Sequence, residues 1–200
     1  MATLRADSDP VWPVRKAIPA NKTQHKQALN PQQIGKLLSG FDNSRGSYQV
    51  NYCMWLMWWT LARPAEVTEA EWKEFDLVNA LWTIPSTRMK ARREHVIPLP
   101  SQAVNMLRTL QGLTKHRQHL FPGRDNPKGP MTSHSLRQLL KSLGWSGIYS
   151  PHATITTGST RLNELGYRPD AIEAQLAHAD TNNVRRTYNC KHPPFSSMRF

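Results

Sequence analysis

Cysteine is scarce in this 200-residue chain, which contains only Cys53 and Cys190. The two lie in unlike surroundings and form no CxxC pair, which argues against a disulfide framework and against a structural zinc site.

Long apolar runs are also lacking. The most apolar stretch, residues 50–62, is interrupted by Asn51 and Thr60 and is shorter than the ~20 residues that a membrane helix needs. The opening residues hold no apolar core of signal-peptide length. We therefore expect a cytoplasmic protein without a membrane span.

Acidic residues are few, with 14 Asp and Glu against 26 Lys and Arg, a net charge of +12 and a pI near 10.2. This excess predicts a polyanionic partner. The basic residues recur in separate clusters: Arg88, Lys90, Arg92 and Arg93; Lys115, His116 and Arg117; Arg185 and Arg186. Such spacing fits a folded surface that follows a phosphate backbone better than a disordered tail. An ordinary solvated basic surface is the alternative.

The length allows one well-buried domain with a short arm. Residues 1–28 are rich in Pro and Lys without periodicity, which predicts a linker or extended arm. Residues 29–190 are predicted to be the folded domain. Residues 191–200 lose periodicity and contain Pro193-Pro194, which predicts an irregular tail.

Apolar periodicity and capping residues predict a mostly helical α+β domain. Asn30-Pro31 gives an N-cap and first-turn pair, and residues 48–62 are apolar on nearly all sides, as in a central buried helix. Two strand-like runs, 80–85 and 95–99, predict a hairpin in a small antiparallel sheet, with Lys90 near its tip. Further helices are predicted to follow Ser101 and Ser133 as caps, and to cover residues 152–165, 169–178 and 181–189.

The predicted central helix delivers Arg63 at its end, where Pro64 starts another helical turn. An arginine at the end of a buried helix is costly to desolvate unless an anion meets it. Pairing with Glu66 or Glu69 is the alternative.

The last third of the chain gathers His152, His178 and Tyr188 in one run of predicted helices. Two imidazoles can donate protons or hydrogen bonds to a phosphate, and a phenol can attack one. This stretch is therefore a candidate site for phosphoryl transfer onto tyrosine.

Taken in order, these positions resemble the catalytic domain of the tyrosine recombinases, specifically the prophage and pathogenicity-island integrases, over residues 28–189. In that family an arginine is followed three residues later by a glutamate, and then by a hairpin lysine, a His-x-x-Arg pair, a histidine, and a tyrosine about ten residues further on. The pattern falls on RPAE with Arg63, RMKARR with Lys90, HATI with His152, QLAH with His178 and RRTYN with Tyr188.

The resemblance implies that Tyr188 attacks a DNA phosphodiester and forms a 3′-phosphotyrosyl link without a metal or other cofactor. Arg63 would bind the non-bridging oxygens, Lys90 would protonate the leaving 5′ oxygen, and His152 and His178 would assist proton transfer. The implied partner is double-stranded DNA at an attachment site, contacted by Arg88, Arg92, Arg93 and Arg185. A homo-oligomer on DNA and a place at the bacterial nucleoid are further expectations.

One position departs from the family pattern, because Ile155 stands where the second arginine of His-x-x-Arg belongs. Isoleucine cannot neutralise an oxyanion, and Arg161, six residues along a helix, would lie about 9 Å further on and about 120° round. We expect a rate loss on the order of 10² to 10⁵. A remnant that grips DNA without cutting it is therefore a second hypothesis. A type IB topoisomerase, which shares the chemistry, is a third, and the integrase-like residues around Lys90 and Tyr188 argue against it.

Overall fold

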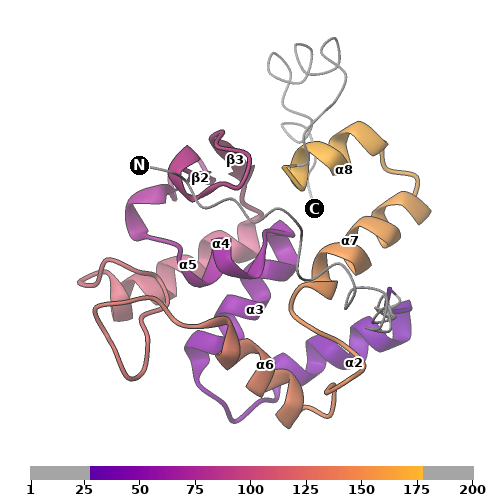
Figure 1. The fold of residues 1–200 in the computed structure, drawn as a ribbon, viewed down its shortest axis with the longest axis horizontal. Coiled ribbons are helices and arrows are strands. Elements are labelled where there is room, and N and C mark those ends of the chain that lie inside the picture. Colours follow the sequence, from indigo (N-terminus) through magenta and orange to yellow (C-terminus); the bar gives the residue numbers. More distant parts are fainter. Residues whose placement is uncertain (1–27, 178–200) are drawn as a thin grey trace, which may run out of the picture.

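The computed structural model describes residues 28–177. Its elements follow the order α2 (Pro31–Asp42), α3 (Tyr48–Thr60), α4 (Pro64–Thr68), η1 (Trp72–Glu74), β1 (Phe75–Asp76), β2 (Leu81–Ile84), η2 (Ser86–Arg88), β3 (His95–Pro98), α5 (Ser101–Thr114), α6 (Ser133–Ser142), α7 (Ala153–Glu164) and α8 (Pro169–Gln175). The domain is mostly helical with a small antiparallel sheet, as the sequence predicts (Figure 1).

The first described helix, α2, begins where the sequence predicts. The Asn30 side chain accepts a hydrogen bond from Gln33 N at 2.9 Å, and the Gln33 side chain accepts one from Asn30 N at 3.0 Å. Pro31 occupies the first turn, where a missing N–H costs nothing. The capping box satisfies two N–H groups that a helix start otherwise leaves unpaired.

Helix α3 is the centre of the domain, because α2, α4, α5, α6 and α7 all contact it (Figure 1). Cys53, Met54, Leu56 and Met57 are fully buried along it. Burial raises the pKa of the Cys53 thiol well above its usual range, so this cysteine is an apolar core residue. The run that is apolar on nearly all sides thus forms the buried central helix that the sequence predicts.

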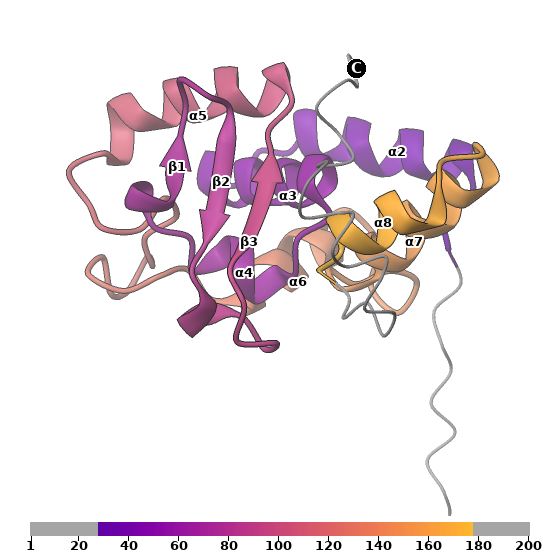
Figure 2. The same ribbon diagram turned by 90° about the horizontal axis from the view of Figure 1, so that it is seen from above.

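The strands form one antiparallel sheet in the order β1-β2-β3. Trp82 lies opposite Ile97, and Ile84 lies opposite His95. Trp82, Ile84 and Ile97 are fully buried, so alternate residues of the hairpin face the core. Figure 2 shows β3 as the strand nearest α8, and this proximity lets His95 of β3 contact Gln175 of α8.

Several predicted helix boundaries differ from the structure, among them those of α5, α6 and α8. Ser101 and Ser133 are the first helical residues of α5 and α6, and the capping positions belong to Pro100 and Thr132, whose side chains make no cap hydrogen bond. Helix α8 ends at Gln175 instead of near residue 178, with Leu176 at its C-cap. The helix predicted over residues 181–189 lies outside the described residues. Within residues 28–177, the helices all fall short of the length and apolarity that crossing a bilayer requires.

Candidate active site

Arg63 lies where the central helix ends. Helix α3 stops at Thr60, and Leu61 adopts a left-handed backbone conformation with φ of 54°, closing the helix through its N–H on Met57 O. Pro64 then starts α4, and Arg63 takes the N-cap position with extended backbone. The chain therefore turns sharply at Arg63, directly beside the buried core.

Glu66 fixes the orientation of the Arg63 side chain. Glu66 Oε1 accepts a hydrogen bond from Arg63 Nη1 at 2.7 Å, and Oε2 accepts one from the Arg63 backbone N at 2.8 Å. Arg63 Nη2 lies 3.4 Å from Leu176 O. The Arg63 side chain nevertheless keeps 31% of its surface exposed, whereas that of Glu66 keeps 8%. The pairing allowed by the sequence is present, and it holds a planar donor fork that still has an exposed face for an anion.

His95 is a site residue that sequence reasoning missed. It opens β3, and its Nε2 lies 3.1 Å from Gln175 O at the end of α8. Burial lowers the pKa of His95, and the Gln175 carbonyl and the Glu66 charge offset this only in part. The Arg63 charge lowers it further, so His95 lies within the electrostatic field of both Arg63 and Glu66. The available signal was that His95 and Ile97 are two residues apart in a predicted strand, so both side chains point to the same face of the sheet.

Arg88, predicted to bind DNA, faces the interior instead. Its Nη1 contacts both carboxylate oxygens of Glu74, at 2.5 and 2.6 Å, and its Nη2 donates to Glu66 O at 2.6 Å. Trp82 Nε1 donates to the same Glu74 carboxylate at 3.0 Å. The side chains of Arg88 and Glu74 are only 14% and 2% exposed, and a phosphate contact would require breaking this pair. Arg88 therefore anchors the base of the hairpin to α4.

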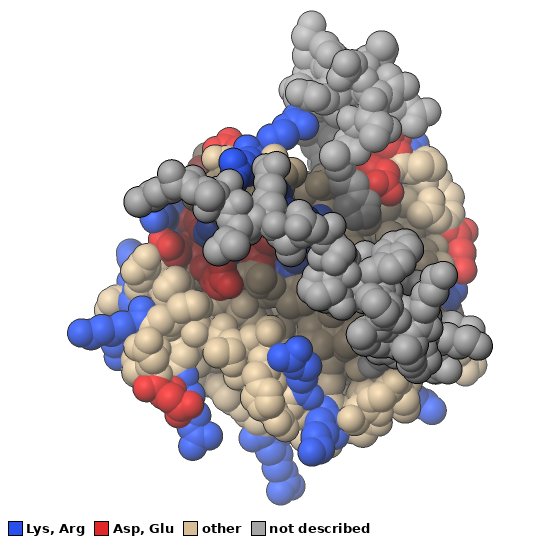
Figure 3. Space-filling model, viewed as in Figure 1, with Lys and Arg blue, Asp and Glu red and all other residues tan. Residues whose placement is uncertain are grey.

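The other basic residues of the hairpin point outward. Lys90, Arg92 and Arg93 are exposed, whereas Met89 between Arg88 and Lys90 is buried and anchors the turn. Basic side chains project from this end of the molecule in Figure 3. The basic residues at the tip of the predicted hairpin are thus accessible to a polyanion.

His152 lies at the N-cap of α7 with an exposed side chain that makes no cap hydrogen bond. Ile155, one turn further on, is half-buried and packs against a small apolar cluster formed by Leu61, Ile172 and Leu176. Leu61 lies two residues before Arg63, and the carbonyl of Leu176 contacts Arg63. Position 155 therefore faces the surroundings of Arg63.

Gly158 allows α7 to approach the end of α3 closely. A Cβ atom added at Gly158 would lie 2.9 Å from Leu61 Cδ1 and closer still to Cδ2. Because real Cβ atoms are essentially never found so near, any other residue would force the Leu61 side chain or the helix to shift. Gly158 thus sets the spacing between the helix that follows His152 and the turn that carries Arg63.

Arg161 does not replace the missing arginine. Its Nε donates to Leu29 O at 2.8 Å, and its Nη1 pairs with Glu164. These contacts hold Leu29 against α7 and give Nε and Nη1 of Arg161 partners within the protein.

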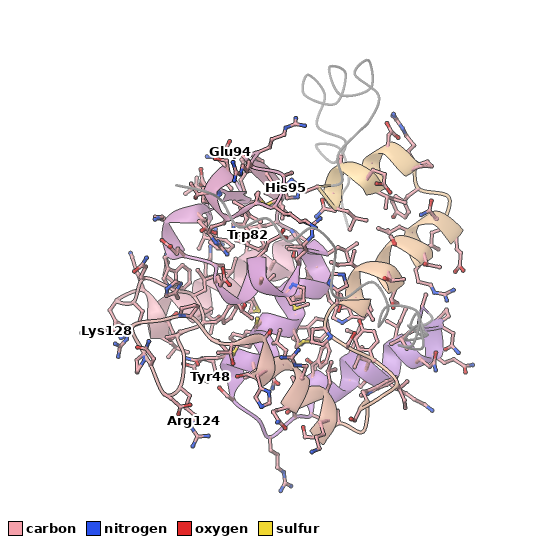
Figure 4. All side chains as sticks on the ribbon, in the orientation of Figure 1. Tyr48, Trp82, Glu94, His95, Arg124 and Lys128 are labelled. Carbon is pink, nitrogen blue, oxygen red and sulfur yellow. The ribbon has the colours of Figure 1, made fainter. Side chains whose placement is uncertain are left out.

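Three predicted site residues, His178, Arg185 and Tyr188, lie outside the described residues. Within residues 28–177 the structure brings together Arg63, Glu66, His95 and the end of α8, with position 155 beside them. Figure 4 labels His95, which lies on the hairpin.

A cavity of about 740 Å³ lies at the opposite end of α3. Tyr48, Arg117, Arg124 and His134 are among its lining residues, and Tyr48 and Arg124 are labelled in Figure 4. None of the described residues predicted to act in catalysis lines it. This cavity and the candidate catalytic residues are therefore separate.

Residues 27–193 match the phage integrase family. This chain is an integrase-family catalytic domain. Similar proteins include prophage integrase IntA of Escherichia coli K12, 36% identical over 183 residues that cover 92% of this chain and 44% of that protein. The integrase of Shigella phage Sf6 is 30% identical over 190 residues, covering 94% of this chain and 49% of that protein. The chain thus spans about half the length of these curated relatives.

The integrase domain shares its fold with solved recombinase structures. The Tn1549 transposon integrase in complex with circular intermediate DNA matches with a TM-score of 0.64 at 18% identity, over 86% of this chain and 64% of that chain. The XerH recombinase bound to its difH substrate in a pre-cleavage complex matches with a TM-score of 0.64 at 17% identity, over 90% and 55%. The predicted family and fold are therefore confirmed.

Proposed function

We propose that this domain cleaves and rejoins double-stranded DNA at a specific site through a 3′-phosphotyrosyl link to Tyr188, as the catalytic part of an integrase. The observation that carries the proposal is the arrangement at Arg63. A buried glutamate orients its guanidinium, one face stays exposed, and the chain that leads to His178 and Tyr188 leaves α8 beside it.

The chemistry conserves bond energy without an external cofactor. The Tyr188 oxygen bonds to phosphorus as its phenol proton is lost with the assistance of His152 or His178, and the 5′ oxygen leaves with a proton from Lys90. The reverse attack by a 5′ hydroxyl breaks the bond between Tyr188 and phosphorus and restores the DNA backbone. Arg63, His152 and His178 would neutralise the charge that develops on the non-bridging oxygens. Each role follows the family pattern. Glu66 supports the role of Arg63 by fixing the orientation of its guanidinium.

Lys90, Arg92, Arg93 and Arg185 are the proposed phosphate contacts. The three hairpin residues are exposed, and DNA is present in the two related recombinase structures. Arg88 is not included because its side chain is only 14% exposed and pairs with Glu74 and the Glu66 carbonyl. We place the catalytic unit at residues 29–190 and propose that it acts on the nucleoid, as a homo-oligomer assembled on DNA.

Ile155 favours a second candidate function, a domain that binds DNA and cleaves it poorly or not at all. Its side chain fills an apolar cluster beside Arg63, where the family pattern has a second arginine. The loss of one such donor typically slows a reaction by about 10² to 10⁵.

A covalent trap tests the proposed function. The protein is incubated with a pool of nicked duplexes that carry a randomised segment, and denaturation-resistant protein–DNA adducts are recovered and sequenced. An adduct attached at Tyr188, absent from Tyr188→Phe and enriched in one sequence, is the expected result. The assay also reports the target sequence.

Two outcomes separate the candidates. Adduct that persists in Tyr188→Phe overturns the assignment of the nucleophile. Retention of one DNA sequence in a filter-binding selection, with no adduct from the same pool, favours the non-cleaving DNA-binding domain.

A further inference from the structure

Three separate parts of the fold fasten the end of α8. The Gln175 side chain donates to Thr60 O at 2.6 Å, and Arg63 Nη2 lies 3.4 Å from Leu176 O. From β3, His95 Nε2 lies 3.1 Å from Gln175 O. The partners are 80 to 115 residues apart in the chain, so these contacts exist only in the folded domain.

Helix α8 depends on such contacts because it is only seven residues long, and an isolated helix of this length is not stable in water. The last carbonyls of any helix also lack intrahelical partners. Here His95 contacts Gln175 O and Arg63 contacts Leu176 O. The next residue, Ala177, has a positive φ of 50°, so the chain turns immediately after the fastened carbonyls.

His95 suits this position chemically. A carbonyl oxygen only accepts hydrogen bonds, so Nε2 must carry the proton. Burial lowers the pKa of His95, which favours the neutral imidazole. It donates to the carbonyl without bringing a second positive charge close to Arg63.

We propose that His95 is a positioning residue that holds the end of α8 against Arg63. This inference deepens the proposed function and rests on it, because residue 178 is the predicted phosphate-binding histidine. His95 does not touch the reacting atoms in this scheme. It sets the point from which the catalytic segment departs.

The test compares His95→Leu with His95→Gln. Glutamine places an amide donor at about the position of Nε2, whereas leucine has similar bulk and no donor. His119→Leu is the matched control, because His119 also contacts a backbone carbonyl, Glu69 O at 3.3 Å, which lies in the turn after α4 and not on α8.

Hydrogen–deuterium exchange of residues 169–177 is the first measurement. We expect His95→Leu to speed exchange of this segment by about five- to tenfold, the effect of losing one hydrogen bond, with no change in α3. His95→Gln and His119→Leu should exchange like the unmodified protein. Unchanged α8 exchange in His95→Leu, or a His95→Gln variant that exchanges as fast as His95→Leu, overturns the proposal.

The second measurement is the rate of adduct formation at saturating nicked DNA, set beside DNA affinity, in the unmodified and Ile155→Arg backgrounds. His95→Leu should slow adduct formation at least fivefold and leave affinity within twofold, and His95→Gln should restore the rate. Equal slowing by both variants contradicts a positioning role. If neither background forms adduct, the proposed function fails, and the exchange pattern alone still decides whether His95 holds α8.

Discussion

Replacing Ile155 with arginine should switch on or strongly accelerate DNA cleavage. Ile155 packs against Leu61 and Leu176; Leu61 lies two residues before Arg63, and the Leu176 carbonyl accepts a hydrogen bond from the Arg63 guanidinium. An arginine at this position can extend its fork toward the phosphate that Arg63 is proposed to bind. By analogy with single oxyanion donors and arginine fingers, the gain in adduct rate should be about 10² to 10⁵.

The structure indicates that the domain will tolerate this change. Complete burial of an isoleucine is worth about 1.5–3 kcal/mol, and Ile155 is only half-buried. The arginine stem can cover part of the same apolar surface. We therefore expect a loss of about 1 kcal/mol or less in the free energy of unfolding. Glu66, already paired with Arg63, offsets part of the repulsion between the two guanidinium groups in the absence of DNA.

The assay is the rate of Tyr188 adduct formation on nicked DNA, with DNA affinity and urea denaturation measured in parallel. Ile155→Leu controls for packing. Thr156→Arg adds the same charge at an exposed neighbour, about 100° further round the helix, and should raise affinity without accelerating cleavage. A folded, DNA-binding Ile155→Arg protein that forms adduct no faster than the unmodified protein would refute the reasoning. So would equal acceleration by Thr156→Arg.

Three further predictions concern the structure around the site. Arg88→Met should lower the free energy of unfolding by about 3–5 kcal/mol, measured by urea denaturation, because it leaves the Glu74 carboxylate buried and unpaired. Gly158→Ala should lower it by about 1–3 kcal/mol, because the new methyl group overlaps the Leu61 side chain and forces it or α7 to shift. Lys90→Ala should slow adduct formation by about 10² to 10⁴ as a lost general acid, while the slope of log affinity against log salt changes by no more than about 1.

Each of these predictions has a control and a contrary outcome. Gly35→Ala has open space around its new Cβ and should stabilise α2 by about 0.5–1 kcal/mol. Equal destabilisation by both glycine variants would contradict the close approach. Arg88→Met with unchanged stability would contradict the buried ion pair. Arg93→Ala should weaken DNA binding like Lys90→Ala without the large rate loss, and equal rates would remove Lys90 from the chemistry.

Local sequence signals predicted most of the scaffold. The capping box at Asn30 and the all-round apolar residues of α3 depend on neighbours a few residues away, so they can be identified without a structure. The strand pattern likewise located the hairpin, although the two-residue strand β1 is too short to give a periodic signal. Ser101 and Ser133 show the limit of such signals, because serine is common both at a cap and in a first turn, and the difference is one residue.

The sequence by itself determined the family, the order of the chemical groups and the elements that carry them, because these depend on residue identity and short-range periodicity. Only the tertiary structure decided which members of a local cluster face inward. Arg88 and Lys90 are two residues apart, yet Glu74 draws the first into the interior while the second stays in solvent. His95 meets Gln175 across 80 residues, and Ile155 meets Leu61 and Leu176. Such contacts are set by how helices and strands pack, and local periodicity does not contain that information.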